Sequence, residues 1–260
     1  MSLPLAGQTI WLTRAEHQNA AWARSLEEAG ATVVLEPLMA IEPVTDRQTA
    51  YRELMQAANA DRLLATSTNA VDAAWQLMPG FAPTGRLYGV GSASAQALEA
   101  AAGRTVERPA GAFTSEGLLA MDTLTDVQGL DIAILSGEGG RNLLVDMLAE
   151  RGARVRKTAL YRRRWLTPRR ERLAQLVRRA DTVIVTSGEA LTHLCDIVDT
   201  GADKGLRADL ERCRLVAPSM RVVKQTDQRL NWQHAPLIVE RISGEAIVAA
   251  LARLSTGDRQ

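Results

Sequence analysis

Short apolar runs, many of them rich in β-branched residues, recur along the chain and stop at small or polar residues. Such runs, bounded by turn-forming residues, are typical of buried strands. The pattern therefore predicts strands at Thr9–Thr13, Ala31–Leu35, Arg62–Thr66, Leu87–Val90, Asp131–Leu135, Arg154–Tyr161, Thr182–Val185, Arg214–Val216 and Leu237–Val239.

Between these runs, apolar residues recur every three or four positions, which predicts amphipathic helices. Gly30 and Gly152 end two of them as helix C-terminal glycines do. Strands that alternate with helices indicate an α/β fold, a mostly parallel sheet with helices on both faces. Helices are expected at Gln18–Ala29, Arg47–Ala58, Asn69–Leu77, Ala93–Ala102, Glu116–Leu124, Asn142–Arg151, Arg169–Arg179 and Gly244–Leu254, and from Glu189 and Arg221 onward.

Two kinds of strand-and-helix segment occur twice. Asn19–Val33 resembles Asn142–Val155, and Arg62–Leu77 resembles Ala180–Leu194, with a Thr-Ser pair in each copy of the second kind. Internal repeats of this kind indicate two similar domains, each a parallel sheet flanked by helices.

Two breaks decide how the repeats combine into domains. Prolines bracket the segment Pro37–Pro43, and a basic stretch followed by Pro168 forms the break Tyr161–Pro168. These breaks predict an inserted domain at residues 38–164 and a discontinuous domain made of residues 1–37 and 165–260, joined by a two-stranded linker. Ligands favour clefts between such domains.

Composition narrows the class of protein. The 260 residues are 46% hydrophobic and 23% charged with a net charge of +1, which indicates a globular chain without a broad nucleic-acid surface. Apolar runs stay well short of the roughly 18 residues of a membrane span. Cys195 lies on an apolar helical face, so a buried thiol is expected, and Cys213 forms no redox or metal motif with it. The N-terminus lacks a signal-peptide pattern, so a cytoplasmic location is expected.

Small, hydroxylic or glycine residues follow most of the predicted strands. The carboxyl ends of parallel strands are where ligands bind in open α/β sheets, and such loops offer N–H and O–H donors to anions. Each loop alone is explained as a helix cap, but six loops at this position favour an anionic ligand. The candidate binding residues are Arg14, Thr66, Ser67, Asn69, Gly91, Ser92, Ser136, Gly137, Gly139, Arg141, Thr186, Ser187, Gly188 and Ser219.

Several cofactor signatures are missing from the sequence. It contains no GxxxxGK[ST], no strand followed by GxGxxG and no GxSxG, and its three histidines are scattered, which argues against a metal site. Chemistry without these groups relies on substrate positioning and general acid catalysis. Tyr161, on the same strand face as Arg163, is the candidate acid. The alternative is a tyrosine packed at the linker with a solvated hydroxyl.

An ordered set of segments resembles the uroporphyrinogen-III synthase family: TRAEHQ, EEAGATVVLEPL, TSTNAV, YGVGSAS, SGEGGR, RGARV with ALYRR, VTSGEAL and APSMRV. The resemblance implies a monomer of two α/β domains that cyclises the linear tetrapyrrole hydroxymethylbilane. The product is uroporphyrinogen III, formed in the interdomain cleft with loss of water and inversion of the last pyrrole ring, without a cofactor. It also implies that Tyr161 is the acid, with Thr186, Ser187 and Ser219 as further donors.

Two other functions fit parts of the pattern. A non-enzymatic two-lobed protein that binds a small polyanion needs the same loops but no acid at Tyr161. A two-domain glycosyltransferase needs a nucleotide site, for which the sequence shows no clear fingerprint. The expected partner is the small-molecule substrate. A transient contact with the preceding pathway enzyme is a further candidate, and neither nucleic acid nor membrane is an expected partner.

Overall fold

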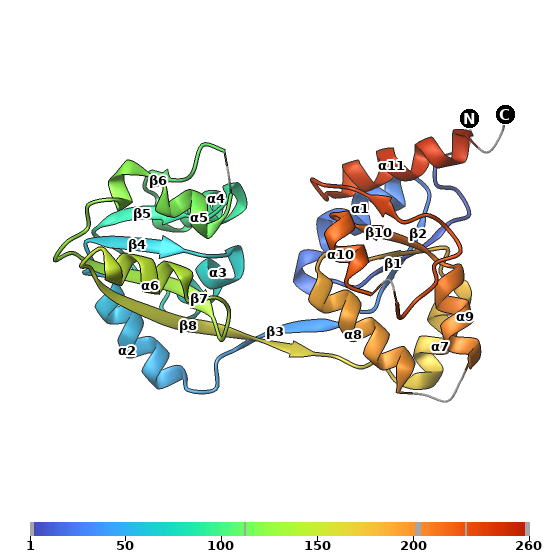
Figure 1. Cartoon of the computed structure of the whole chain (residues 1–260), viewed down its shortest axis with the longest axis horizontal. Coiled ribbons are helices and arrows are strands. Elements are labelled where there is room, and N and C mark those ends of the chain that lie inside the picture. Colours follow the sequence, from blue (N-terminus) through green and yellow to red (C-terminus); the bar gives the residue numbers. More distant parts are fainter. Residues whose placement is uncertain (1–2, 112, 201–203, 227, 258–260) are drawn as a thin grey trace. The chain divides into compact units, whose positions relative to one another are not determined.

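The computed structural model of the chain describes residues 3–111, 113–200, 204–226 and 228–257. The residues divide into two compact units, one formed by residues up to 40 together with those from 164 onward, and one formed by residues 41–163. Figure 1 labels the helices and strands of both units. Among the described residues, no helix is long and apolar enough to cross a membrane.

The first unit contains a sheet whose strands, in the described part of the chain, run in the order β11-β10-β9-β1-β2. All four neighbouring pairs are parallel. The strands are β1 (Thr9–Leu12), β2 (Thr32–Leu35), β9 (Thr182–Ile184), β10 (Arg214–Ala217) and β11 (Leu237–Ile238).

Helices cover both faces of this sheet because successive side chains of a strand point to opposite sides. Ile10 and Leu12 pack in the cluster with α1 (Ala20–Glu28) and α11 (Gly244–Gly257), whereas Trp11 packs in the other cluster. That second cluster includes residues of α7 (Arg170–Arg179), α8 (Gly188–Asp199), α9 (Lys204–Arg212) and α10 (Met220–Lys224). A 3-10 turn, Glu16–Gln18, precedes α1.

The second unit contains a sheet in the order β3-β8-β7-β4-β5-β6 within the described residues. The pairs β8-β7, β7-β4, β4-β5 and β5-β6 are parallel. The strands are β3 (Met39–Pro43), β4 (Arg62–Ala65), β5 (Arg86–Gly89), β6 (Val106–Glu107), β7 (Asp131–Gly137) and β8 (Arg154–Trp165).

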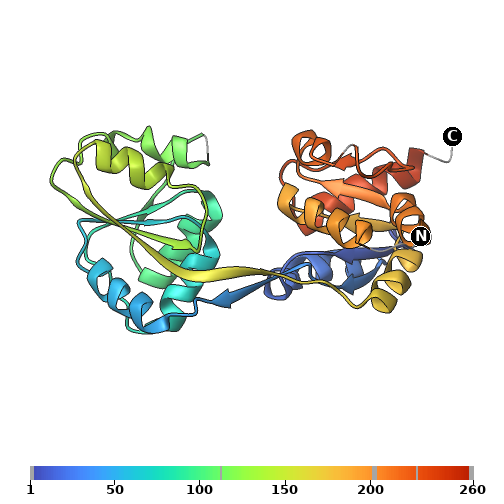
Figure 2. The same cartoon turned by 60° about the horizontal axis from the view of Figure 1, so that its bottom comes forward.

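Two helical layers enclose this sheet, as Figure 2 shows. Leu63 and Ala65 of β4 pack toward α2 (Arg47–Ala57), α3 (Thr68–Leu77) and α4 (Ser92–Ala102), whereas Leu64 packs toward α5 (Ser115–Leu119) and α6 (Leu143–Glu150). The prediction of an α/β fold with parallel sheets flanked by helices is therefore confirmed.

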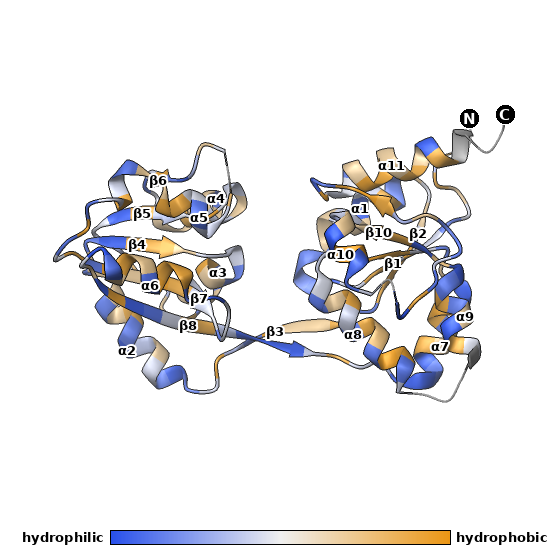
Figure 3. Ribbon diagram, viewed as in Figure 1, coloured by the Kyte–Doolittle hydropathy of each residue, from blue (hydrophilic) through white to orange (hydrophobic). Residues whose placement is uncertain are grey.

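The chain passes from one unit to the other within β3 and β8, which are neighbours in the sheet. The basic residues 162–164, expected to belong to a break, continue β8 as a strand that ends at Trp165. Arg162 forms an ion pair of 3.1 Å with Glu42 of β3, so charge pairing stabilises this polar end of the strand. Figure 3 shows the hydrophilic end of β8.

Candidate functional site

A pocket of about 220 Å³ lies at the carboxyl ends of β4 and β7 and beside β8, within residues 41–163. This edge of the sheet is where the strand-to-helix loops begin. Seven of the predicted site residues line the pocket. They are Thr66, Ser67, Ser136, Gly137, Gly139, Arg141 and Tyr161.

Tyr161 is almost fully buried, with 8% of its surface exposed, yet it lines the pocket. Its hydroxyl lies 3.2 Å from Oγ of Ser67, and either oxygen can donate that hydrogen bond. The backbone N–H of Glu138 donates to the carbonyl oxygen of Tyr161 at 2.7 Å, which fastens β8 to the end of β7. Tyr161 is thus held by hydrogen bonds at both its backbone and its side-chain hydroxyl group.

Ser67 also begins α3 as its N-cap. Its Oγ accepts a hydrogen bond of 3.2 Å from the backbone N–H of Ala70. An N-cap hydroxyl keeps its own proton for a further bond. Ser67 can therefore cap the helix and donate to the oxygen of Tyr161 at once, which leaves the phenolic proton free to point into the pocket.

Three cationic side chains line the same pocket: Arg141, Lys157 and Arg163. Nζ of Lys157 donates to the carbonyl oxygen of Gly139 and to Oδ1 of Asn142, both at 2.9 Å. Arg141 forms an exposed ion pair of 2.8 Å with Glu116. The pocket is suited to anionic groups because three cationic side chains and several hydroxyl groups line it.

Sequence reasoning missed two polar groups that line this pocket, Ser115 and Lys157, and placed Arg163 beside Tyr161 without assigning it a role. The signal for Arg163 was present, because residues 161 and 163 share one alternation of β8. Lys157 carried no such signal, because the register of β8 shifts by one residue between Ala159 and Tyr161. Ser115 carried no such signal, since it reaches the pocket from the start of α5.

Three predicted residues of this unit lie at helix starts and are not among the residues that line the pocket. Gly91 is the N-cap of α4, and Ser92 is its first residue. Asn69 lies in the first turn of α3, directly after Ser67 and Thr68. Local helix geometry accounts for the types of Gly91 and Ser92.

The remaining predicted residues belong to the other unit, at the carboxyl ends of β1, β9 and β10. Arg14 follows β1, and its guanidinium lies 4.2 Å from the centroid of the Trp22 ring and donates to Gln18 at 3.2 Å. Burial lowers the pKa of Arg14 below its usual value. Ser219 is the N-cap of α10 and makes no side-chain cap bond.

The loop after β9 repeats the geometry seen after β4. Ser187 caps α8, and its Oγ accepts from the N–H of Ala190 at 3.1 Å, as Ser67 does for α3. Thr186 precedes this cap and Gly188 opens the helix. A Cβ on Gly188 would lie 1.5 Å from Oε1 of Gln225, so the Gln225 side chain rests directly on this glycine.

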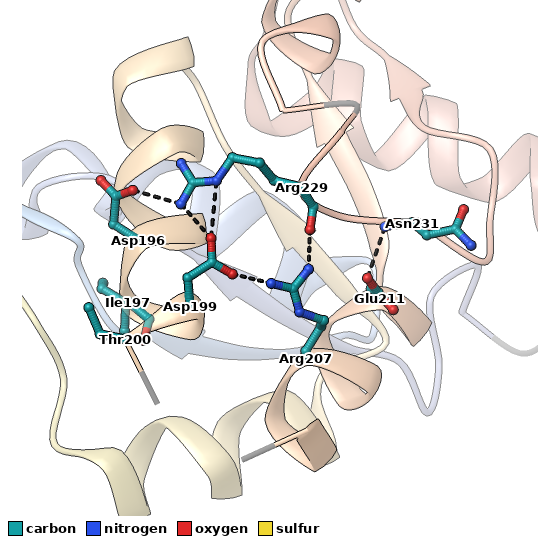
Figure 4. Close-up of polar contacts among 8 residues, drawn as sticks. All are labelled: Asp196, Ile197, Asp199, Thr200, Arg207, Glu211, Arg229 and Asn231. Carbon is teal, nitrogen blue, oxygen red and sulfur yellow. Dashed lines mark hydrogen bonds and ion pairs between the residues drawn. The ribbon is translucent and has the colours of Figure 1, made fainter. Parts of the chain in front are cut away.

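Ion pairs hold Arg229 against α8 and α9 (Figure 4). Nη2 of Arg229 contacts Asp196 at 2.7 Å and Asp199 at 2.6 Å, both on α8. Arg207 of α9 donates to Asp199 and to the carbonyl oxygen of Arg229. Because these contacts join α8, α9 and residue 229, they hold Arg229 against the carboxyl-terminal end of α8.

The described residues contain no group of three or more His, Cys, Asp or Glu side chains placed to hold a metal ion. Burial raises the pKa of Cys195 and of Cys213 to about 11. Both are free and buried, so the prediction of a buried thiol at Cys195 is confirmed.

Comparison with known proteins gives one consistent result. The family model described as uroporphyrinogen-III synthase HemD matches residues 20–236. The uroporphyrinogen-III synthase of Escherichia coli K12 is 28% identical over 227 residues, which cover 83% of this chain and 88% of that protein. The one from Proteus mirabilis is 30% identical over 159 residues, 60% of this chain and 80% of the relative.

Among solved structures, a crystal structure of a mutant uroporphyrinogen III synthase from the extremely thermophilic bacterium Thermus thermophilus matches with a TM-score of 0.62. The match covers 97% of this chain and all of that chain (100%) at 21% identity, and it shows a shared fold. The family model spans most of the chain and agrees with the named relatives. The chain therefore belongs to the uroporphyrinogen-III synthase HemD family.

Proposed function

We propose that this chain cyclises hydroxymethylbilane to uroporphyrinogen III and that Tyr161 supplies the proton for the departing hydroxyl group. The observation that carries the proposal is the phenol of Tyr161, held by Ser67 in a pocket lined by three cationic side chains. Family membership supports the reaction, and the geometry of the pocket supports the role of Tyr161.

The first step is loss of water from the hydroxymethyl group. The electron pair of the neighbouring pyrrole nitrogen expels the hydroxyl, the carbon–oxygen bond breaks, and the oxygen takes the phenolic proton of Tyr161. Ser67, as hydrogen-bond donor, stabilises the phenolate that remains. A weak acid suffices because the nitrogen already drives the departure of the leaving group.

The second step joins the ends of the tetrapyrrole. The substituted carbon of the last ring attacks the new electrophilic carbon and gives a spiro intermediate. The bond between the attacking carbon and its original bridging carbon then breaks, and the bridging carbon bonds instead to the free α-carbon of the same ring, which inverts the ring. That α-carbon loses its proton, which restores the aromaticity of the ring and returns the proton count of Tyr161. The protein contributes mainly by folding the flexible substrate into the attacking geometry.

Substrate binding rests on charge. The substrate carries eight carboxylates, and we propose that Arg141, Lys157 and Arg163 bind those that enter the pocket. The remaining predicted residues are also proposed to bind substrate carboxylates through N–H, O–H or guanidinium donors. They are Arg14, Asn69, Gly91, Ser92, Thr186, Ser187, Gly188 and Ser219.

We further propose that the enzyme works in the cytoplasm and receives its substrate through a transient contact with the preceding pathway enzyme. Both cysteines are free thiols, which fits a reducing compartment.

A product-isomer assay tests the proposed function. Purified protein is mixed with freshly generated hydroxymethylbilane, and the oxidised porphyrins are separated by isomer. We expect mainly the type III isomer. Type I product alone, which spontaneous closure gives, would reject the enzyme and favour a protein that only binds the polyanion.

A further inference from the structure

The ring of Tyr161 lies directly on the backbone of Gly137. A Cβ added to Gly137 would come within 2.6 Å of Cζ, 2.8 Å of Cε2 and 3.0 Å of Cε1 of that ring. Real Cβ atoms essentially never approach other atoms below 3.0 Å. Gly137 is absent from the glycines with positive φ, so its backbone conformation does not require glycine. Glycine is required there because the ring of Tyr161 occupies the space that a side chain would need.

A local irregularity between β7 and β8 creates this stacking. Ser136 pairs with Ala159, but the next residue, Gly137, pairs with Tyr161, so β8 carries one extra residue at this point. Such bulges re-aim side chains and occur often beside active sites. Here the bulge aligns Tyr161 with Gly137 at the pocket.

The position of the ring sets the position of its hydroxyl, which lies 3.2 Å from Oγ of Ser67. An added methyl group at residue 137 would have to push the ring by about 0.8 Å to reach the 3.4 Å of ordinary contact. Displacement of a reacting group by about 1 Å can cost up to about 10²-fold in rate, so a shift of this size can remove the whole contribution of one proton donor.

We propose that Gly137 is a positioning residue for Tyr161, a role that rests on the proposed function of Tyr161 as proton donor. Its missing side chain allows the ring to lie flat on the strand. The phenolic oxygen then stays within reach of both Ser67 and the leaving hydroxyl of the substrate. Gly137 acts through Tyr161 and not through its own contact with the substrate.

The test combines Gly137→Ala with two changes at Tyr161. Gly137→Ala is expected to lower kcat about as much as Tyr161→Phe does, with KM changed less than twofold. In the Tyr161→Phe background, Gly137→Ala is expected to cause no further loss of kcat, because the hydroxyl is already gone. Gly80→Ala is the matched control, since a Cβ there meets nothing within 4 Å, and its kcat should equal that of the unmodified protein.

Folding gives an independent readout. Gly137→Ala should lower the denaturation midpoint of the unmodified chain but cause little further loss in a Tyr161→Ala background, because removing the ring removes the clash. If Gly137→Ala alone does not fold, a double variant that is as stable as Tyr161→Ala alone supports the proposal in the same way.

Failure of the proposed role of Tyr161 and failure of the positioning role of Gly137 give different results. If Tyr161→Phe keeps full kcat, the proposed role of Tyr161 is wrong, and the positioning role fails with it. If Tyr161→Phe is impaired but Gly137→Ala is fully active, only the positioning role is overturned. An effect of Gly137→Ala on KM alone, an equal kcat loss in the Tyr161→Phe background, or an equal loss of stability in the Tyr161→Ala background would also overturn it.

Discussion

Ser67 joins two functions in one side chain. Its hydroxyl accepts from the N–H of Ala70 at the start of α3 and lies 3.2 Å from the hydroxyl of Tyr161. Helix capping therefore explains only one of the two contacts that Ser67 makes. The cap places the serine, and the placed serine holds the phenol.

Substitutions at Ser67 should separate these functions. Ser67→Ala removes both, so we expect lower kcat and a free energy of unfolding reduced by about 1 kcal/mol, the usual cost of a lost cap. Ser67→Asp keeps a capping oxygen but has no proton to donate to the phenol, so stability should return while kcat stays low. Steady-state kinetics and urea denaturation measure the two effects.

Asp46→Ala serves as the control for cap loss. Asp46 caps α2 by accepting from the N–H of Thr49 at 2.9 Å, and it does not line the pocket. This variant should lose stability without losing kcat. Full kcat in Ser67→Asp would show that the phenol does not need the serine proton.

The buried thiols predict a pH dependence. Burial raises the pKa of Cys195 and Cys213 from 9.0 to about 11. Between pH 9 and 11 the unfolded chain releases thiol protons that the folded chain retains, so the free energy of unfolding should fall as pH rises through this window. A variant with both cysteines changed to alanine should show a flatter fall in urea denaturation from about pH 8 to about pH 10.5. Equal slopes for the two proteins would contradict this expectation.

At the scale of residues, the sequence predicted the site candidates whose residue type and position relative to a strand both point to a binding or catalytic role. Tyr161 ends the predicted strand beside arginines, and Ser67 follows a buried run, so both were identified, although their catalytic and binding roles remain proposals. The stacking of Tyr161 on Gly137 could not be predicted, because it depends on a one-residue shift between β7 and β8. Periodicity alone places Leu160 and Tyr161 on opposite faces, whereas both pack in the same hydrophobic cluster.

At the scale of elements, the strand-loop-helix repeat was predicted because hydrophobic period and polar loop residues agree there. The expected helix Glu116–Leu124 was wrong: α5 ends at Leu119, and a separate 3-10 turn, Asp122–Leu124, follows. The strand β6 and the helix α9 were not predicted. β6 has two residues, and the apolar side chains that α9 buries are two leucines, Leu206 and Leu210, so each gave a weak pattern.

The network at Arg229 supports a prediction about the packing of elements. One guanidinium contacts carboxylates at Asp196 and Asp199, which a lysine ammonium, a single point charge, reproduces poorly. Arg229→Lys should reduce the free energy of unfolding by about 1 kcal/mol, since networks exceed isolated surface pairs. Urea denaturation at low and high salt measures this loss.

Arg178→Lys is the control, because Arg178 forms an exposed ion pair with Asp209 at 3.2 Å. Its loss should be a few tenths of a kcal/mol. Equal losses in both variants would mean that the Arg229 network adds nothing beyond ordinary surface pairs.

At the scale of the whole molecule, each hydrophobic cluster of the described residues belongs to one unit. The clusters around Leu63 and Leu64 lie within residues 41–163, and those around Trp11 and Ile10 lie in the rest of the chain. A continuous segment with its own core is expected to fold by itself.

The predicted inserted domain, residues 38–164, can be tested in this way. Expressed alone, it should unfold cooperatively in urea, because it contains the clusters around Leu63 and Leu64 and all the strands from β4 to β7. A segment that ends at Arg151 is the control, since it lacks β8 and should not fold cooperatively. Non-cooperative unfolding of residues 38–164 would reject the division into these domains.

The central claim is that the pocket phenol gives its proton to the departing hydroxyl. The most direct measurement is kcat of Tyr161→Phe with hydroxymethylbilane, with type III product counted separately from spontaneous type I. General acids contribute about 10²- to 10⁴-fold. Because the pyrrole nitrogen assists departure, we expect a smaller loss, about tenfold, with KM little changed and the fold intact by circular dichroism. An unchanged kcat in a folded variant would contradict the account.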